Sequence, residues 1–258
     1  MNELKTLLLD VRDRVATVTL NRPPVNAQNA EMRAELTALF DELSDRDDVM
    51  AIVLTGAGKV FCAGADIRER PNLAGVPGAY GRHNRLVRET HNAIVECSKP
   101  VIAAVNGAAL GAGFGLVMAS DIWVMSENAY VSMPEINVGL AGGVSYLQRY
   151  FSQSRARRMF YTGMQVNAAE LYRLGLTEAC LPPAELMPYA MGIANEIASK
   201  APVAMRLAKE AARLTLAMPQ REAYRYEQSN TVALSRTEDA KEAQLAFLEK
   251  RQPVYKGR

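Results

Sequence analysis

The sequence NGAALGAGFGLVMASD, residues 106–121, follows the apolar, β-branched run VIAAV at residues 101–105, and together they predict the centre of the fold. The run predicts a buried strand. FGLVMA predicts a buried helix that begins inside a turn rich in glycine (Gly107, Gly111, Gly113 and Gly115). A helix start leaves backbone N–H groups unpaired, and the helix dipole adds partial positive charge there. Such a turn binds a phosphate group or stabilises a developing oxyanion.

Neither of the two glycine-rich turns in the first half of the chain matches a nucleotide-binding fingerprint. Gly111, Gly113 and Gly115 are spaced G-x-G-x-G rather than G-x-G-x-x-G. The TGAGK at residues 55–59 lacks the earlier glycine and the following Ser or Thr of a phosphate loop. The spacing therefore argues against a dinucleotide or ATP site.

Composition excludes several broad classes of protein. The chain has 258 residues, 49% of them hydrophobic, which predicts a globular protein with a full core. The net charge of +2 argues against a nucleic-acid binder. We expect no signal peptide and no membrane span. We also expect no metal site, because the three cysteines are scattered and lack metal-ligand spacing. A reduced, cytoplasmic protein is the expectation.

Hydrophobic periodicity predicts strand–turn–helix units followed by helices only. Strands are expected within residues 4–20 and at 51–54, 101–105, 121–125, 129–133 and 176–181. Residues 59–66 read as a second small-residue turn, 71–81 as a mobile surface loop and 136–143 as a third glycine turn. Helices are expected at 31–43, 82–97, 144–150, 155–162, 168–174, 184–199, 202–216, 221–235 and 238–250.

Most of the candidate polar residues have an ordinary structural interpretation. His83 and His91 fall eight residues apart in one predicted helix, and we interpret them as part of its polar face. Cys62 lacks a histidine motif and is interpreted as a buried structural thiol rather than a nucleophile. Asp66 is expected to cap a helix, and Asp121 to anchor a strand.

Glu135 differs, because it ends a strand beside Pro134 and precedes a glycine turn. A carboxylate desolvated in that place has a raised pKa, as a general base needs.

At this point the residues resemble the crotonase, or enoyl-CoA hydratase/isomerase, superfamily. The resemblance covers essentially the whole chain. It is carried by NRPPVNA (21–27), FCAGADI (61–67), KPVIAAVNGAALGAGFGL (99–116), SDIWVMSENAYVSMPEINVGL (120–140) and FLEKRQPVYKGR (247–258). It implies an α/β fold: a crotonase-type ββα spiral core, placed at residues 1–198, and a C-terminal all-helical trimerisation region at 199–258. It also implies acyl-CoA thioester substrates and a homo-oligomer, a trimer or hexamer. Coenzyme A enters as part of the substrate, with no metal or other cofactor.

The resemblance also assigns site residues. An enolate forms from a thioester only if its oxygen is stabilised, and by position the backbone N–H groups of Ala65 and Ala112 would do this. Glu135 would be the acid/base. The matched CoA-binding positions in the same subunit are Val25, Ala63, Ala65, Asp66, Ile67 and Arg68. Phe247 and Lys250 would reach the adenine and phosphate end of CoA in a neighbouring subunit.

Two departures from the family pattern bear on the reaction. Hydratases of the family carry two glutamates around the water, and the place of the first is taken here by Gly115. The loop after Gly139 is short and lacks the aspartate that some members place there. One carboxylate fits isomerisation of 3-enoyl to 2-enoyl thioesters better than addition of water. Hydration or dehydration with a single glutamate, and CoA-thioester binding without catalysis, are the alternatives. The acyl group stays open.

Overall fold

The computed structural model describes residues 4–73 and 75–258, which form two sheets and the helices that cover them. The six-stranded sheet has the order β1-β2-β3-β5-β7-β10 and the four-stranded sheet the order β4-β6-β8-β9. The strands are β1 (Leu7–Arg12), β2 (Val15–Leu20), β3 (Ala51–Gly56), β4 (Val60–Cys62), β5 (Val101–Val105), β6 (Ala108–Leu110), β7 (Ile122–Ser126), β8 (Tyr130–Ser132), β9 (Val166–Asn167) and β10 (Ala179–Leu181).

The helices occupy the segments between strands and then the whole C-terminal part. They are α1 (Ala30–Asp45), α2 (Ala79–Glu96), α3 (Ala112–Ala119), α4 (Val144–Tyr150), α5 (Gln153–Thr162), α6 (Ala168–Arg173), α7 (Pro183–Ala198), α8 (Pro202–Thr215), α9 (Gln220–Leu234) and α10 (Glu238–Glu249). Two 3-10 helices, η1 (Ile67–Leu73) and η2 (Pro134–Val138), lie between them.

The chain winds between the two sheets as a spiral. It passes through β3, β4 and α2, then β5, β6 and α3, then β7 and β8 before η2 and α4. In each turn the first strand adds to the large sheet in parallel and the second adds to the small sheet. This is the ββα spiral expected from the resemblance, and the α/β fold class is confirmed.

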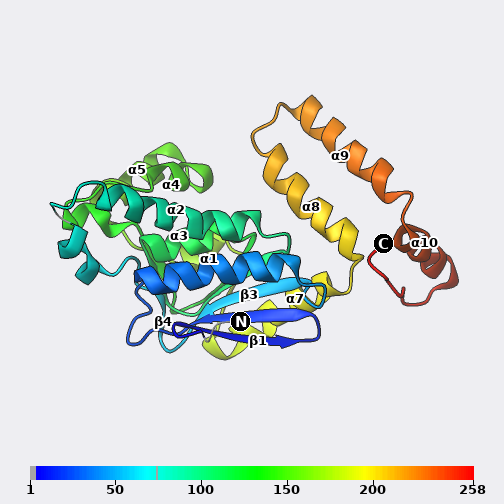
Figure 1. Ribbon diagram of the computed structural model, residues 1–258, viewed down its shortest axis with the longest axis horizontal. Coiled ribbons are helices and arrows are strands. Elements are labelled where there is room, and N and C mark those ends of the chain that lie inside the picture. The colour runs from blue at the N-terminus through cyan, green and yellow to red at the C-terminus, as the bar shows by residue number, and fades with distance from the viewer. Residues whose placement is uncertain (1–3, 74) are drawn as a thin grey trace.

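The large sheet is buried on both faces. Every residue of β3 and β5 is buried, as continuous apolar runs predict for parallel strands. One face packs against α1, α2 and α3, and the other against α7, which presents Leu186, Ala190 and Ala194 at helical spacing. Figure 1 shows the two groups of helices on opposite sides of the sheet.

Four segments expected to be turns or loops contain regular structure. Residues 59–66 contain β4, and the glycine turn after β5 contains β6, so these two strands of the small sheet are additions to the prediction, whereas β8 matches the strand expected at 129–133. Within 71–81, η1 runs to Leu73 and α2 begins at Ala79, while Ala74 lies outside the described residues. The third glycine turn begins as η2. A strand of three residues inside a turn rich in glycine and small residues gives too short a period to be recognised from sequence.

Helices α8, α9 and α10 extend away from the spiral as an arm (Figure 1). At its base, the buried Lys209 donates from Nζ to Asp121 Oδ2 at 2.9 Å and to the Lys99 carbonyl at 2.8 Å. The Asp121 carboxylate also accepts the Val101 N–H at 2.7 Å, so it anchors β5 as expected. A domain boundary at residue 199 stays a prediction. None of the described helices is long and apolar enough to cross a membrane.

Candidate active site

The two small-residue turns pack directly against each other. A Cβ built on Gly64, whose φ is +91°, would lie 2.6 Å from the Leu110 carbonyl oxygen and 3.5 Å from the Ala112 nitrogen. A Cβ on Gly113 would collide with the Cys62 carbonyl. Only glycine allows this approach at both places. The contact brings the N–H groups of Ala65 and Ala112 to neighbouring turns.

Both N–H groups lie outside the local backbone ladders. The residue pair Gln28–Ala65 forms a parallel bridge whose hydrogen bonds, at 2.8 and 2.9 Å, use the Gly64 carbonyl and the Asp66 N–H. Ala112 is the first residue of α3, before the intrahelical ladder begins. Ala65 and Ala112 line the same cavity of about 520 Å³. Two backbone N–H groups placed in this way, one of them at a helix N-terminus, can stabilise a developing oxyanion.

Gln28 connects the two turns from behind. Its fully buried side-chain amide donates from Nε2 to the Ala112 carbonyl at 3.0 Å, while its backbone holds the Ala65 turn. The neighbouring Cys62 thiol is fully buried, and burial raises its pKa to about 11. Cys62 is therefore a structural thiol, as expected.

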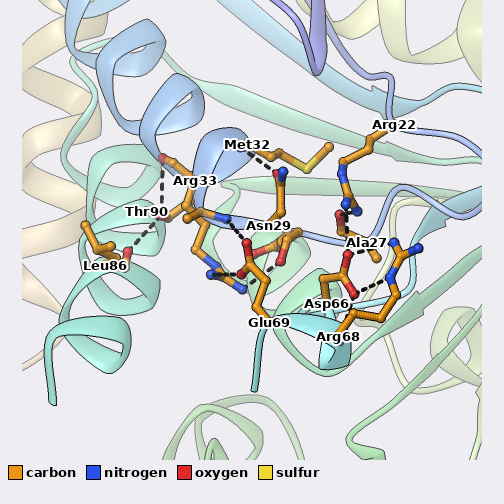
Figure 2. Close-up of polar contacts among 12 residues, drawn as sticks. Arg22, Ala27, Asn29, Met32, Arg33, Asp66, Arg68, Glu69, Leu86 and Thr90 are labelled. Atoms are coloured by element: carbon orange, nitrogen blue, oxygen red, sulfur yellow. Dashed lines mark hydrogen bonds and ion pairs between the residues drawn. The ribbon is translucent and has the colours of Figure 1, made fainter. Parts of the chain in front are cut away.

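Ion pairs fix the segment that follows Ala65 (Figure 2). The Asp66 carboxylate accepts from the Arg22 guanidinium at 2.8 Å and from Arg68 at 2.7 Å. Hydrogen bonds from Arg68 and then from Arg22 hold the Asp66 pKa well below its usual range. Asp66 also accepts the Arg68 N–H, which is the capping role expected of it. Glu69 accepts the Ala30 N–H at the start of α1 and pairs with the buried Arg33.

Glu135 lies at the start of η2, where Pro134 occupies the first turn. Its side chain crosses to the glycine turn before α3, because a Cβ on Gly111 would collide with the Glu135 carboxylate. Gly111 is held at φ 51° and ψ −120°, and its N–H donates to the Ser132 carbonyl at 2.9 Å. Glu135, Ala65 and Ala112 therefore line one cavity.

His91 corrects one expectation. It is not on a polar helix face, because only 6% of the residue is exposed and its ring lies over Gly115. Its Nε2 lies 3.3 Å from the Ala112 carbonyl oxygen, and its ring meets the Tyr146 ring edge-on at 5.7 Å. His83, eight residues earlier in α2, lines the same cavity. The sequence feature that could have indicated the burial of His91 is Gly115. A glycine in a buried helix leaves a space in the core, and a side chain from another element must fill it.

The remaining predicted positions fall into two groups. Val25 and Ala63 are joined by a backbone hydrogen bond of 3.0 Å, and Ile67 is 58% exposed beside the Asp66–Arg68 pair. These residues form a surface next to Ala65. The second group, Phe247 and Lys250, belongs to the end of α10, on the arm and away from this surface (Figure 1).

Comparison with known proteins settles the family. The family model described as Enoyl-CoA hydratase/isomerase matches residues 10–258. The chain belongs to the enoyl-CoA hydratase/isomerase family. It is 37% identical over 254 residues to a short-chain-enoyl-CoA hydratase of Clostridium acetobutylicum, covering 96% of this chain and 97% of that one. It is 36% identical over 267 residues to a carnitinyl-CoA dehydratase of Escherichia coli, covering 98% and 99%.

A solved structure shares the whole architecture. The enoyl-CoA hydratase of Bacillus anthracis superposes with a TM-score of 0.92 at 34% identity, covering 98% of this chain and all of that one. As a member of the enoyl-CoA hydratase/isomerase family, the chain is an enzyme that acts on acyl-CoA substrates. Among the described residues there is no group of three or more His, Cys, Asp or Glu placed to hold a metal ion.

Proposed function

We propose that the chain forms thioester enolates from acyl-CoA substrates, with Glu135 as the acid/base, and that it interconverts 3-enoyl and 2-enoyl thioesters. The observation that carries the proposal is that Glu135 lines the same cavity as Ala65 and Ala112. A base opposite two oxyanion donors is the arrangement that removal of a proton next to a carbonyl requires.

In the proposed reaction, the Glu135 carboxylate takes a proton from C2 of the 3-enoyl thioester. The C–H electron pair forms a C1–C2 double bond, and the carbonyl electrons move to the oxygen held by the two N–H groups. When the carbonyl re-forms, C2 becomes doubly bonded to C3, and C4 receives the proton from the Glu135 carboxyl group. One carboxylate serves both carbons, since proton uptake and return occur on the same face.

Addition of water to 2-enoyl thioesters is the second candidate. It is supported by relatives at 36–37% identity that are named hydratase and dehydratase. The absence of a side chain at Gly115 counts against it only if the second polar group must be a carboxylate.

We further propose that the CoA site is completed by a neighbouring subunit of a trimer or hexamer. The arm exposes large apolar side chains, among them Leu216 at 74%, Phe247 at 83% and Leu248 at 77%. Faces of this kind are typical of subunit contacts. In such an assembly Phe247 offers a ring to the adenine and Lys250 a charge to a phosphate. A reduced, cytoplasmic setting remains our expectation, with Cys62, Cys97 and Cys180 as free thiols.

Incubation with 3-enoyl-CoA and with 2-enoyl-CoA tests the proposal, with products separated by chromatography. Exchange of the C2 protons of a saturated acyl-CoA into deuterated water, followed by NMR, reports enolate formation alone. Isomerisation with exchange supports the proposal. Tight CoA-thioester binding without exchange or turnover would leave the binding-protein alternative. A crystal of an acyl-CoA complex should place the thioester oxygen roughly 2.7–3.1 Å from the Ala65 and Ala112 nitrogens.

A further inference from the structure

The imidazole of His91 occupies the volume that a side chain at position 115 would need. A Cβ built on Gly115 lies 2.5 Å from His91 Nε2, a distance that real Cβ atoms essentially never show. Gly115 belongs to α3 and His91 to α2, so a side chain from one helix fills the space left open by the other. This is the position at which the chain lacks the first glutamate of the family pattern.

The neighbour of the ring favours one tautomer. The Ala112 carbonyl can only accept, so the hydrogen bond to the Nε2 atom 3.3 Å away requires the tautomer in which Nε2 carries the proton. Nδ1 then keeps its lone pair. Burial lowers the His91 pKa, the charge of Arg33 lowers it further, and the bond to Ala112 opposes both. The ring is therefore neutral at physiological pH and can accept a proton.

His91 also lies beside the other groups of the proposed site. It lines the cavity that Glu135 and Ala112 line, and it bonds to the residue that supplies one oxyanion N–H. An apolar side chain would fill the space beside Gly115 without the cost of burying a polar ring. A neutral imidazole there is a base in addition to Glu135, and a search of the motif for carboxylates alone does not find it.

We infer that His91 is a second catalytic group, which holds and deprotonates the water that adds to C3 of a 2-enoyl thioester. A water proton passes to the unprotonated ring nitrogen as the oxygen bonds to C3. The C2–C3 π electrons move through the thioester to its oxygen, and as the carbonyl re-forms C2 takes the proton of the Glu135 carboxyl group. The imidazolium and the Glu135 carboxylate then exchange protons with solvent. The inference rests on hydration, the second candidate above.

Substitutions at positions 91 and 115 test this inference. We expect His91→Gln, which keeps the volume and can still donate to the Ala112 carbonyl, to lower the hydration kcat by about 10²-fold or more. C2-proton exchange, which needs only Glu135 and the N–H groups, should fall much less than hydration does. His91→Ala opens the space, and the double variant His91→Ala/Gly115→Glu should recover at least about tenfold of the loss by placing a carboxylate there.

The pH profile separates a proton-carrying ring from a packing one. Wild-type hydration should fall as pH drops through the lowered His91 pKa, and in the double variant that limb should move down to the range of a carboxylic acid. The titratable or charged groups that line the cavity or act on the ring come from α1, α2, η2 and α4: Arg33, Tyr80, His83, Arg88, Glu135 and Tyr146. None of these groups is changed in the variants. A shift in the acidic limb of the pH profile is therefore caused by the substitutions at positions 91 and 115.

Asn92→Ala, which alters the next residue of α2 outside the cavity lining, is the matched control, and thermal melting checks that each variant folds. If His91→Ala does not fold, His91→Gln decides alone. Hydration at wild-type rate in His91→Gln overturns the inference and leaves hydration standing. A wild-type enzyme that exchanges C2 protons but adds no water overturns the inference together with hydration and leaves the Glu135 proposal intact.

Discussion

Replacing Gly111 by alanine should disable the site through the carboxylate of another element. The added methyl group would collide with the Glu135 carboxylate. Only glycine adopts a backbone conformation of φ 51° and ψ −120° without strain. The backbone cannot move to relieve the contact. The Gly111 N–H bonds to the Ser132 carbonyl, and the Gly111 carbonyl accepts the first hydrogen bond of α3, both at 2.9 Å. The Glu135 side chain must therefore move.

The magnitude follows from these two costs. An unfavourable backbone conformation costs about 1–3 kcal/mol, and the melting temperature of a chain this size falls by roughly 2–4 °C for each kcal/mol. Displacing a catalytic group by about 1 Å costs about 10²-fold in rate. We expect Gly111→Ala to melt several degrees lower and to exchange C2 protons about 10²-fold more slowly, with little change in CoA affinity.

The assay is C2-proton exchange by NMR, with melting followed by circular dichroism. Gly192→Ala is the control, since that glycine lies inside α7 with open space where a Cβ would be. In a Glu135→Gln background, Gly111→Ala should slow exchange little further, because both changes remove the same group. Wild-type exchange and melting in Gly111→Ala would refute this reading of the turn.

Three other predictions concern separate parts of the molecule. Glu135→Gln should keep the fold and CoA binding while turnover falls by about 10²-fold or more, and near-wild-type turnover would contradict its role. Lys250→Ala should raise the apparent KM with little change in kcat, because a remote phosphate contact is the same in ground and transition states; sedimentation that finds a fully active monomer would contradict the shared site. Lys209→Met removes the buried partner of Asp121, so the free energy of unfolding should fall by about 3 kcal/mol in urea titration, and an unchanged midpoint would contradict the anchoring role.

The large sheet and the helices follow from sequence because their signals are long. VIAAV and AIVL are continuous apolar runs, and α1 repeats its buried residues at helical spacing. Two strands of the small sheet, β4 and β6, were missed because they are three residues each and lie beside glycines. Their regularity comes from pairing between distant turns of the spiral, which no local pattern carries.

For the site, sequence placed Glu135, Ala65 and Ala112 through the family motif, and the three line one cavity. It gave His91 the wrong environment. A histidine eight residues after another on a charged helix looks solvated, and the neighbour that buries it, Gly115, is 24 positions further along the chain. Residues that fill a gap left by a distant glycine are visible only once the two helices are in contact.

The beginning of α3 shows why counting carboxylates in the motif is a weak guide to the reaction. Gly111 and Gly115 each leave a space that a side chain from another element fills, Glu135 from η2 and His91 from α2. The turn itself contributes backbone N–H groups and room. In the proposed function, the turn therefore sets where the thioester oxygen is held, while the proton chemistry depends on which side chains reach the two spaces. A chain with glycine in place of a glutamate here can still have two polar groups at the reacting carbons if a second helix supplies one of them. The substitutions at positions 91 and 115 test this directly.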